Sequence, residues 1–376
     1  MSDRFLTCLA VIACGYGLST VLVYPVRLLG VRFGVLDFPG ARKTHSEPIP
    51  RTGGLAIFAA LTIVVWGSLL GFSQIDLGWL SSTFQQSILA LSQYTVILRK
   101  LTVLFAGAAI VTAVGLVDDI RGVNFSPLLK LFAQVVAATI LIPVGIYLDL
   151  FDFSPPLSMF LSVVWVVGIC NSFNLLDNMN GLSSGIGLIC SCVFLALVLL
   201  KGEFFIALLL SALIGSILGF FQFNVRRGWI FMGDSGSLLI GYMLGAISLM
   251  ARYVDPSEAS IFPALAPLII LGLPLFDTFS VIAIRLLDGR PIYVGDQMHL
   301  SHRLVRLGMS KKQAVLFNFL MAFTIAVNAL LMINSQIVHS VVVVFQVTAL
   351  VSMVSILMTT GIRAANGNGN GNGVGK

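Results

Sequence analysis

The sequence has few charged residues. Only 10% of its 376 residues are Asp, Glu, Lys or Arg, whereas 57% are hydrophobic and the mean hydropathy is +0.99. A soluble domain carries roughly 25% charged residues, so this chain has too few of them to cover a surface in water. The composition therefore excludes a soluble globular protein and predicts an integral membrane protein.

The signatures of several common site types are also missing. The five cysteines lie in apolar stretches without the spacing to a His that a metal site needs, and we interpret them as buried apolar residues. Neither an HExxH zinc motif nor a GxxxxGK[ST] phosphate loop occurs. These absences argue against a zinc centre and against ATP-driven transport within this chain.

Long apolar runs make up most of the sequence. A helix needs about 20 apolar residues to cross the hydrocarbon of a bilayer, and about eleven runs approach that length. The runs are 5–24, 53–72, 101–117, 128–148, 157–172, 183–200, 204–222, 236–250, 260–284, 313–333 and 337–360. We therefore expect an all-α, polytopic membrane protein with about 11 transmembrane helices.

Helix signals and composition refine this expectation. Ser126 and Pro127 predict the N-cap and the first residue of the fourth helix. Three prolines in the run 260–284 predict a kinked or broken helix. Residues 73–100 between two runs have the periodicity of an amphipathic helix that lies on the membrane. We expect a single membrane domain over residues 1–362, followed by a disordered Gly/Asn-rich tail over residues 363–376.

The basic residues predict the orientation of the chain. With eleven spans, alternate loops lie on opposite sides, and 17 of the 22 Lys and Arg residues fall in one set of loops. Basic loops stay in the cytoplasm, so we expect the N-terminus outside, the C-terminus in the cytoplasm, and a multi-pass protein of the inner (plasma) membrane. This pattern explains the net charge of +6 better than a nucleic-acid partner does.

Acidic residues in polar motifs share the predicted cytoplasmic face. They are Asp118 and Asp119 in "GLVDDIRG", Asp177 in "NSFNLLDNMNG", Asp234 in "IFMGDSGS" and Asp277 in "PLFDTF". The acids of the predicted outer face lie in no Gly- or Asn-rich motif. A charged residue inside an apolar run, as Asp277 is, is a functional hypothesis by default. The shared depth of these acids predicts one polar site at the membrane surface.

The acidic motifs suit a divalent cation and a phosphate. Carboxylates such as those of Asp118 and Asp119 are ligands that Mg²⁺ uses together with water and substrate phosphate, although a solvated turn is the alternative. Asp234 lies between two glycines at the start of a predicted helix, where the following amides and hydroxyls suit an anion. The alternative there is a capped helix start.

Amides and imidazoles accompany the acids. Asn171, Asn174 and Asp177 recur every three residues and can share one helical face, where they would hold a sugar, a phosphate or a metal-bound water. Hydrogen bonding between helices is the alternative role. "HLSHRL" holds two His and one Arg that can form a diphosphate-binding patch: His299, His302 and Arg303.

Together, the motifs resemble those of the polyprenyl-phosphate N-acetylhexosamine-1-phosphate transferases, integral membrane enzymes of bacterial wall and surface-polymer synthesis. The matching stretches are "RKTHSEPIPRTGGLAI", "GLVDDIRG", "NSFNLLDNMNGLSSG", "RRGWIFMGDSGSLLIG", "PLFDTFSVIAIRLLDGRPIY" and "DQMHLSHRL". The basic "KTHSEPIPR" and the short "HLSHRL" look more like the branch that uses UDP-N-acetylglucosamine than the pentapeptide-muramoyl branch.

The resemblance implies roles for individual residues. Catalysis would involve Asp118, Asp119 and Asp177, and the metal, Mg²⁺ with Mn²⁺ as the alternative, would bind Asp234 and Asp118. The implied substrate-binding residues are Asn171, Asn174, Asn180, Asp277, His299, His302 and Arg303. Two departures from the family pattern are Asn180, where many relatives have a second Asp, and Ser301, where close relatives often have His.

The resemblance also implies a reaction. A sugar-1-phosphate, with N-acetylglucosamine-1-phosphate as the expected group, passes from a UDP-sugar to polyprenyl (undecaprenyl) phosphate and UMP leaves. The expected partners are this lipid and the UDP-sugar, with a homodimer as a candidate assembly. Asp118 or Asp119 would take the last proton of the lipid phosphate or position it, or an Asp would form a covalent intermediate.

Two other protein classes share parts of the pattern. A secondary transporter would use Asp277 and Asp177 as ion-coupling sites, but such acids should lie near mid-membrane, whereas most acids here share one face. A CDP-alcohol phosphotransferase would carry several Asp within one helical segment, and that signature is missing from the sequence.

Overall fold

The computed structural model describes residues 2–39, 47–71, 94–149, 153–226, 229–254, 261–287, 289, 298–333 and 337–369. Almost all of the regular structure in these residues is helical, as the sequence predicts. The chain divides into two compact units, Met1–Arg252 and Tyr253–Lys376, and each is considered by itself.

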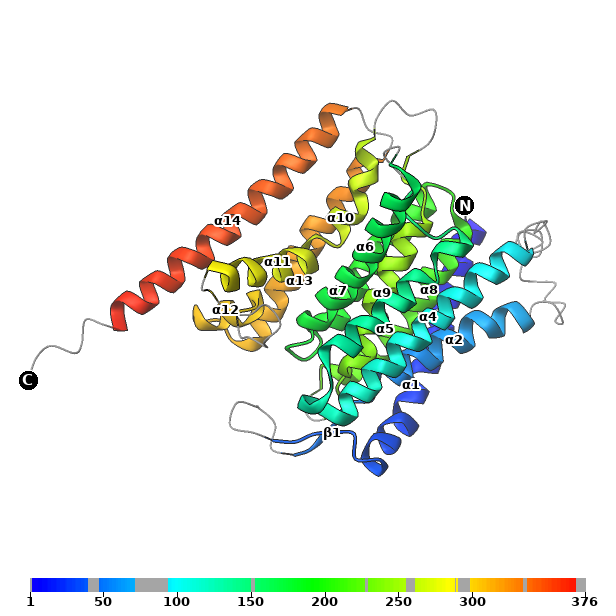
Figure 1. The fold of residues 1–376 in the computed structure, drawn as a ribbon, viewed down its shortest axis with the longest axis horizontal. Coiled ribbons are helices and arrows are strands. Elements are labelled where there is room, and N and C mark those ends of the chain that lie inside the picture. The colour runs from blue at the N-terminus through cyan, green and yellow to red at the C-terminus, as the bar shows by residue number, and fades with distance from the viewer. Residues whose placement is uncertain are drawn as a thin grey trace, which may run out of the picture. The chain divides into compact units, whose positions relative to one another are not determined.

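The first unit is a helix bundle with one short hairpin. Its elements are α1 (Ser2–Arg32), β1 (Leu36–Asp37), β2 (Ile49–Pro50), α2 (Gly53–Gly71), α4 (Tyr94–Arg121), α5 (Pro127–Thr139), α6 (Pro155–Leu176), α7 (Leu182–Leu200), α8 (Phe204–Asn224) and α9 (Gly233–Met250), with 3₁₀ turns at Gly122–Asn124 and Ile142–Val144. Strands β1 and β2 pair antiparallel. Figure 1 shows α4, α5 and α6 side by side, and α5 contacts both neighbours.

Helix α9 is the buried centre of this bundle. Most of its side chains are buried, and it packs against α2, α4, α6 and α7. Glycines on these neighbours permit the close approach: a Cβ added to Gly54 would lie 2.1 Å from the backbone nitrogen of Gly236, and one added to Gly115 would lie 2.5 Å from that of Ser235. Small residues allow helices in a membrane to approach closely in this way. The N-terminus of α9 is thereby fixed against α2 and α4.

The second unit contains the remaining helices. They are a 3₁₀ turn at Phe262–Leu265, α10 (Ala266–Ile270), α11 (Gly272–Leu287), α12 (Leu300–Arg306), α13 (Lys311–Val327), a 3₁₀ turn at Asn328–Met332 and α14 (Ile337–Gly369). The pair 262–270 and 272–287 bends by 70°, which confirms the broken helix predicted from the prolines. Helix α13 begins with a capping box between Ser310 and Gln313.

The membrane character of the fold is confirmed, whereas the number of spans stays a prediction. Each of the eleven apolar runs overlaps at least one helix. Within the described ranges, eight helices are long and apolar enough to cross a membrane, or nine if the bent pair forms one span. Gly53–Leu69 is a shorter apolar helix.

The local helix predictions had mixed outcomes. Helix α5 begins at Pro127 after Ser126, as predicted. Helix α4 begins at Tyr94 rather than at residue 101, so its first turns include polar residues that the apolar run does not. Most of the predicted amphipathic helix at 73–100 lies outside the described residues.

Candidate active site

Asp119 binds the N-terminus of α9. Its carboxylate oxygens accept hydrogen bonds from the backbone N–H groups of Asp234, at 3.0 Å, and Ser235, at 3.1 Å, and the residue is only 7% exposed. The first amides of a helix are a favourable place for a negative charge. The sequence predicted an anion site here, but at these two amides the anion is the chain's own carboxylate.

A left-handed glycine brings these groups together. Gly233 has φ +73°, and a Cβ at this position would lie 2.5 Å from Oδ2 of Asp119 and 2.3 Å from the carbonyl oxygen of Arg51. A side chain at residue 233 would therefore displace Asp119 or the segment after β2. The same segment is anchored by hydrogen bonds from Phe231 N to Pro50 O, at 2.8 Å, and from Gly53 N to Phe231 O, at 2.9 Å.

Lys130 lies among the side chains of three predicted site residues. Its Nζ donates to Asp118 Oδ2 at 2.8 Å, to Asn174 Oδ1 at 3.0 Å and to Asp234 Oδ2. These four side chains come from α4, α5, α6 and α9, so the bundle brings Asp118, Asn174 and Asp234 to one point as the motifs predicted. One ammonium group compensates two carboxylates there, which leaves the cluster with a net negative charge.

A second polar contact lies one helical turn along α5 and α6. Asn171 donates from Nδ2 to Oε1 of Gln134 at 2.6 Å. Gln134 follows Lys130 by four residues, and Asn171 precedes Asn174 by three, so each pair shares a helix face. Asn174 also donates to Ser237 Oγ of α9 at 3.0 Å. The two predicted asparagines therefore connect α6 to α5 and α9.

Asp177 and Asn180 follow the end of α6. Asp177 is the C-cap residue of α6 and is half-buried. Burial and the nearby negative charge of Asp234 raise the pKa of Asp177 to about 8, against the opposing effect of Arg51. Asn180 is exposed in the turn before α7. Its role in substrate binding stays a prediction.

The second unit brings together another group of predicted residues. Asp277 Oδ2 lies 2.8 Å from Nδ1 of His299, and Asp277 Oδ1 accepts from the backbone N–H of Leu300 at 2.6 Å. Both Asp277 and His299 are buried, at 1% and 4% exposure. Asp277 therefore orients His299 and caps the start of α12, a specific partnership for the predicted intramembrane acid.

The other two residues of this motif also lie on α12. Arg303 donates to Ser280 Oγ at 2.7 Å, while its buried Nε has no hydrogen-bond partner among the described residues. Desolvation, and then the charges of His299, Lys311 and Arg306, lower the pKa of His302. His302 is therefore uncharged near pH 7 and can serve as a hydrogen-bond donor or acceptor rather than as a cation.

The first unit offers oxygen donors for a divalent cation. No group of three or more His, Cys, Asp or Glu side chains with metal-site geometry occurs in the part of the chain that the structure describes. Two carboxylates and one amide oxygen nevertheless gather around the Lys130 ammonium. Hard oxygen ligands of this number suit Mg²⁺, which completes its shell with water and substrate phosphate. The donor set therefore fits the expected metal.

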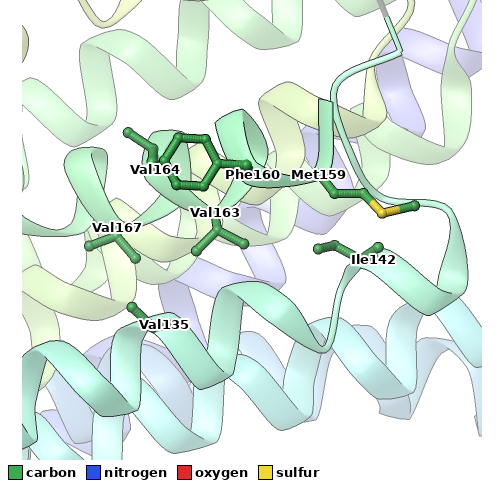
Figure 2. Close-up of a pocket in the computed structure, with 7 residues that line it drawn as sticks. All are labelled: Val135, Ile142, Met159, Phe160, Val163, Val164 and Val167. Carbon is green, nitrogen blue, oxygen red and sulfur yellow. The ribbon is translucent and has the colours of Figure 1, made fainter. Parts of the chain in front are cut away.

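An apolar cavity lies along α5 and α6 of the same unit. It has a volume of about 440 Å³ and is lined by Val135, Ile142, Met159, Phe160, Val163, Val164 and Val167. Figure 2 shows these side chains on the two facing segments. Phe160 and Val164 are 63% and 51% exposed, so the cavity opens on the surface of the helices. We refer to it as the α5–α6 cavity.

Sequence reasoning missed two polar residues of the site. Lys130 and Gln134 belong to none of the motifs that the sequence analysis singled out, although both interrupt the apolar run 128–148. A charged or amide side chain within such a run is itself a signal of function. In the structure, the Lys130 ammonium contacts Asp118 and Asp234.

Comparison with known proteins gives a consistent identification. The profile of a family described as "Glycosyl transferase family 4" matches residues 101–252. The chain is 32% identical to a "Probable undecaprenyl-phosphate N-acetylglucosaminyl 1-phosphate transferase" of Bacillus subtilis, over 89% of this chain and 88% of the relative. It is 33% identical to a "Decaprenyl-phosphate N-acetylglucosaminephosphotransferase" of Mycolicibacterium smegmatis, over 81% of this chain and 77% of the relative.

A third relative is more distant. An "Undecaprenyl-phosphate alpha-N-acetylglucosaminyl 1-phosphate transferase" of Salmonella typhi is 26% identical over 86% of this chain and 83% of its own length. The similarity to these relatives thus covers most of the chain. The chain belongs to glycosyl transferase family 4, the polyprenyl-phosphate N-acetylhexosamine-1-phosphate transferases.

Proposed function

We propose that the protein transfers N-acetylglucosamine-1-phosphate from UDP-N-acetylglucosamine to a polyprenyl phosphate and releases UMP. The observation that carries the proposal is the cluster of Lys130, Asp118, Asp234 and Asn174 on four helices, in a chain related to enzymes named for this transfer. The names of the relatives favour neither a transporter nor the pentapeptide-muramoyl branch.

The chemistry follows from the charges of the reactants. An oxygen of the lipid phosphate attacks the sugar-linked phosphorus of the UDP-sugar, a new P–O bond forms, and the bond to UMP breaks. A phosphate monoester carries about −1.5 to −2 charges at pH 7, so its oxygen needs little help from a base. Its approach to a diphosphate requires cations that offset the repulsion. Lys130 supplies one such charge.

The different contacts of the two adjacent aspartates support different roles for them. Asp118 faces Lys130, where it can position the ammonium and accept the last proton of the lipid phosphate. The carboxylate of Asp119 is already bound to two backbone amides of α9. We therefore assign the proton-accepting role to Asp118 and a positioning role to Asp119.

Mg²⁺ is the cofactor that we propose. Asp234 and Asp118 would hold it, with the amide oxygen of Asn174 in reach of the same point. When bound, the cation would neutralise charge on the phosphate oxygens. With the cation held there, Lys130 could turn from the carboxylates toward a substrate phosphate.

The α5–α6 cavity is the place that we propose for the first part of the polyprenyl chain. It begins at Val135, which directly follows Gln134, and at Val167, which lies about one turn from Asn171. A lipid phosphate beside Lys130 would then place its chain along an apolar surface. By the same family resemblance, His299, His302 and Arg303 of the second unit would bind the diphosphate of the donor.

We also propose the finer features of topology and assembly. Eleven spans with the N-terminus outside, in the inner membrane, would place the Asp-containing motifs in the cytoplasm, where UDP-sugars are made. Reporter fusions at residue 73 and at the C-terminus should report opposite sides; the same side for both would contradict this topology. A homodimer would appear as a doubled mass in detergent-corrected light scattering.

The test of the function is a direct assay. Purified protein with polyprenyl phosphate, UDP-N-acetylglucosamine and Mg²⁺ should release UMP, and omission of the lipid or addition of EDTA should stop the release. Asp234→Asn is the matched inactive variant, and it should still insert into the membrane. Release of UMP without lipid, or no release from folded protein with any UDP-sugar, would refute the proposal.

A further inference from the structure

Gln134 has a buried hydrogen-bond donor without a partner. The residue is 1% exposed, and its Oε1 accepts the hydrogen bond from Asn171 Nδ2. Its Nε2 has no hydrogen-bond partner among the described residues. A buried polar group that is left unsatisfied destabilises a protein, so such groups are uncommon unless a ligand or water completes them.

The position of this amide is specific. On α5, Gln134 lies one turn after Lys130, at the polar cluster, and directly before Val135, which lines the α5–α6 cavity. Its partner Asn171 lies one turn from Val167, another lining residue of that cavity. Four residues of helix correspond to a rise of about 6 Å between Lys130 and Gln134. The unpaired donor therefore lies at the boundary between the charged cluster and the apolar surface.

We propose that Nε2 of Gln134 donates a hydrogen bond to a phosphate oxygen of the polyprenyl phosphate, so that Gln134 recognises the junction between phosphate and chain. The inference rests on the proposed function. It assigns a residue that binds the lipid substrate of that reaction. An anionic oxygen is a strong acceptor for a buried N–H group. The two reactants differ here, because only the polyprenyl phosphate joins its phosphate directly to an apolar chain that suits the cavity.

The alternative is a purely structural amide. Gln134 accepts a hydrogen bond from Asn171, so its removal can disturb the packing of α5 against α6 and weaken any lipid in the cavity. The two roles differ in one measurable respect. A structural defect weakens binding of polyprenyl phosphate and of the uncharged polyprenol alike, whereas loss of a phosphate contact weakens binding of the phosphate alone.

The experiment measures how tightly polyprenyl phosphate and polyprenol bind to the full-length protein in nanodiscs. Each lipid displaces radiolabelled polyprenyl phosphate, and EDTA is present throughout. Gln134→Met keeps the length of the side chain and removes the donor. The matched control is Gln222→Met on α8, where Nε2 donates to Thr20 Oγ1 at 2.8 Å. We expect Gln134→Met to weaken polyprenyl phosphate binding about 10-fold or more and to leave polyprenol binding within about 2-fold, since hydrogen bonds to charged groups are the stronger ones. Gln222→Met should change neither.

Other results would overturn the inference. Equal weakening of both lipids would make Gln134 structural, and unchanged binding of both would remove the contact. If Gln134→Met fails to insert, Gln134→Asn makes the same distinction, because it keeps both polar atoms and withdraws them by one methylene.

Steady-state assays separate this inference from the proposed function. The KM for the lipid should rise in Gln134→Met while the KM for UDP-N-acetylglucosamine stays unchanged. A wild type that makes no UMP refutes the function itself, whereas an active wild type with an unchanged lipid KM in the variant refutes only the role of Gln134.

Discussion

Asp119 caps the helix that carries Asp234. The carboxylate of Asp119 accepts the backbone N–H of Asp234 at 3.0 Å and that of Ser235 at 3.1 Å, while the adjacent Asp118 points to Lys130. Neighbouring acids of one motif thus act in different ways: one fixes where α9 begins, and the other lies in the charged cluster.

Asp118→Asn should mainly lower turnover, whereas Asp119→Asn should mainly lower stability. Asp119→Asn removes a charge from a helix N-terminus and offers one oxygen to two donors, so we expect the free energy of unfolding to fall by about 1–2 kcal/mol. Asp118→Asn should cost less stability but more than 100-fold in turnover, as loss of a charged group in direct contact with reacting phosphate typically does (about 10²–10⁴-fold). Melting temperature in detergent and UMP release measure the two effects. An equal loss of stability in both variants would contradict the division.

Lys130→Gln should make the stability of the first unit depend on a divalent cation. The substitution leaves the carboxylates of Asp118 and Asp234 close together without the ammonium that bridges them. Removal of one partner from a buried ion pair costs about 3–5 kcal/mol, and we expect a smaller loss here because these side chains are 14–31% exposed. A bound cation should restore part of this loss, so Mg²⁺ should raise the melting temperature of Lys130→Gln more than that of the wild type. Lys201→Gln, at the end of α7, is the control. A variant insensitive to Mg²⁺ would argue against a metal at these carboxylates.

Asp277→Asn should impair the binding of the donor rather than of the lipid. Asp277 accepts from Leu300 N and contacts Nδ1 of His299, so it fixes both the start of α12 and the orientation of the imidazole. An Asn can satisfy only one of these donors. We expect the KM for UDP-N-acetylglucosamine to rise about 10-fold to 100-fold, the usual cost of losing a carboxylate that orients a functional His. Phe279→Tyr on the exposed side of α11 serves as the control, and an unchanged donor KM in Asp277→Asn would remove Asp277 from the site.

Asp177 should make the metal-free protein less stable as the pH rises. Its pKa in the folded protein is about 8, above the ordinary value for a carboxyl group, because of burial and the charge of Asp234. Between the ordinary pKa and about 8 the folded state binds more protons than the unfolded state, so stability falls as the pH increases through this window. Asp177→Asn resembles the protonated acid, so this variant should lose less stability than the wild type as the pH rises. Melting temperatures of both proteins in EDTA between pH 6 and 9 measure the difference, and parallel curves would contradict the assignment.

The sequence predicted the composition of the site better than its arrangement. The motifs named Asp118, Asn174 and Asp234, which do meet, because each sits at the end of an apolar helix and these ends lie together in the bundle. The sequence could not distinguish the contacts of Asp118 from those of Asp119, because these contacts depend on where α9 begins. A left-handed Gly233 and the close contact with Gly115 decide this position, and both depend on tertiary packing.

The residues on α5 were missed for a different reason. Helix α5 holds one Lys and one Gln in 13 residues, and the sequence alone does not say which neighbouring helices these two side chains face. Only the neighbouring helices show that both side chains face the site, Lys130 through Asn174 and Gln134 through Asn171. Pairing between distant residues of this kind has no periodic signature in one sequence.

A side chain that fills the α5–α6 cavity should discriminate between acceptors by length. Val163 lines this cavity from α6, about two turns from Asn171, so a short lipid phosphate would occupy the polar end without reaching it. Val163→Trp should therefore lower kcat/KM for a long polyprenyl phosphate about 10-fold, by analogy with the 1–3 kcal/mol cost of overfilling a packed site, and should spare a two-isoprene phosphate. Leu157→Trp is the matched control, because Leu157 is 42% exposed on the same helix and is not among the lining residues. Equal losses with both lipids would mean that the substitution damages the bundle, and no loss with either would place the polyprenyl chain elsewhere on the protein. Selective loss with the long lipid would show that the chain enters the membrane along α5 and α6.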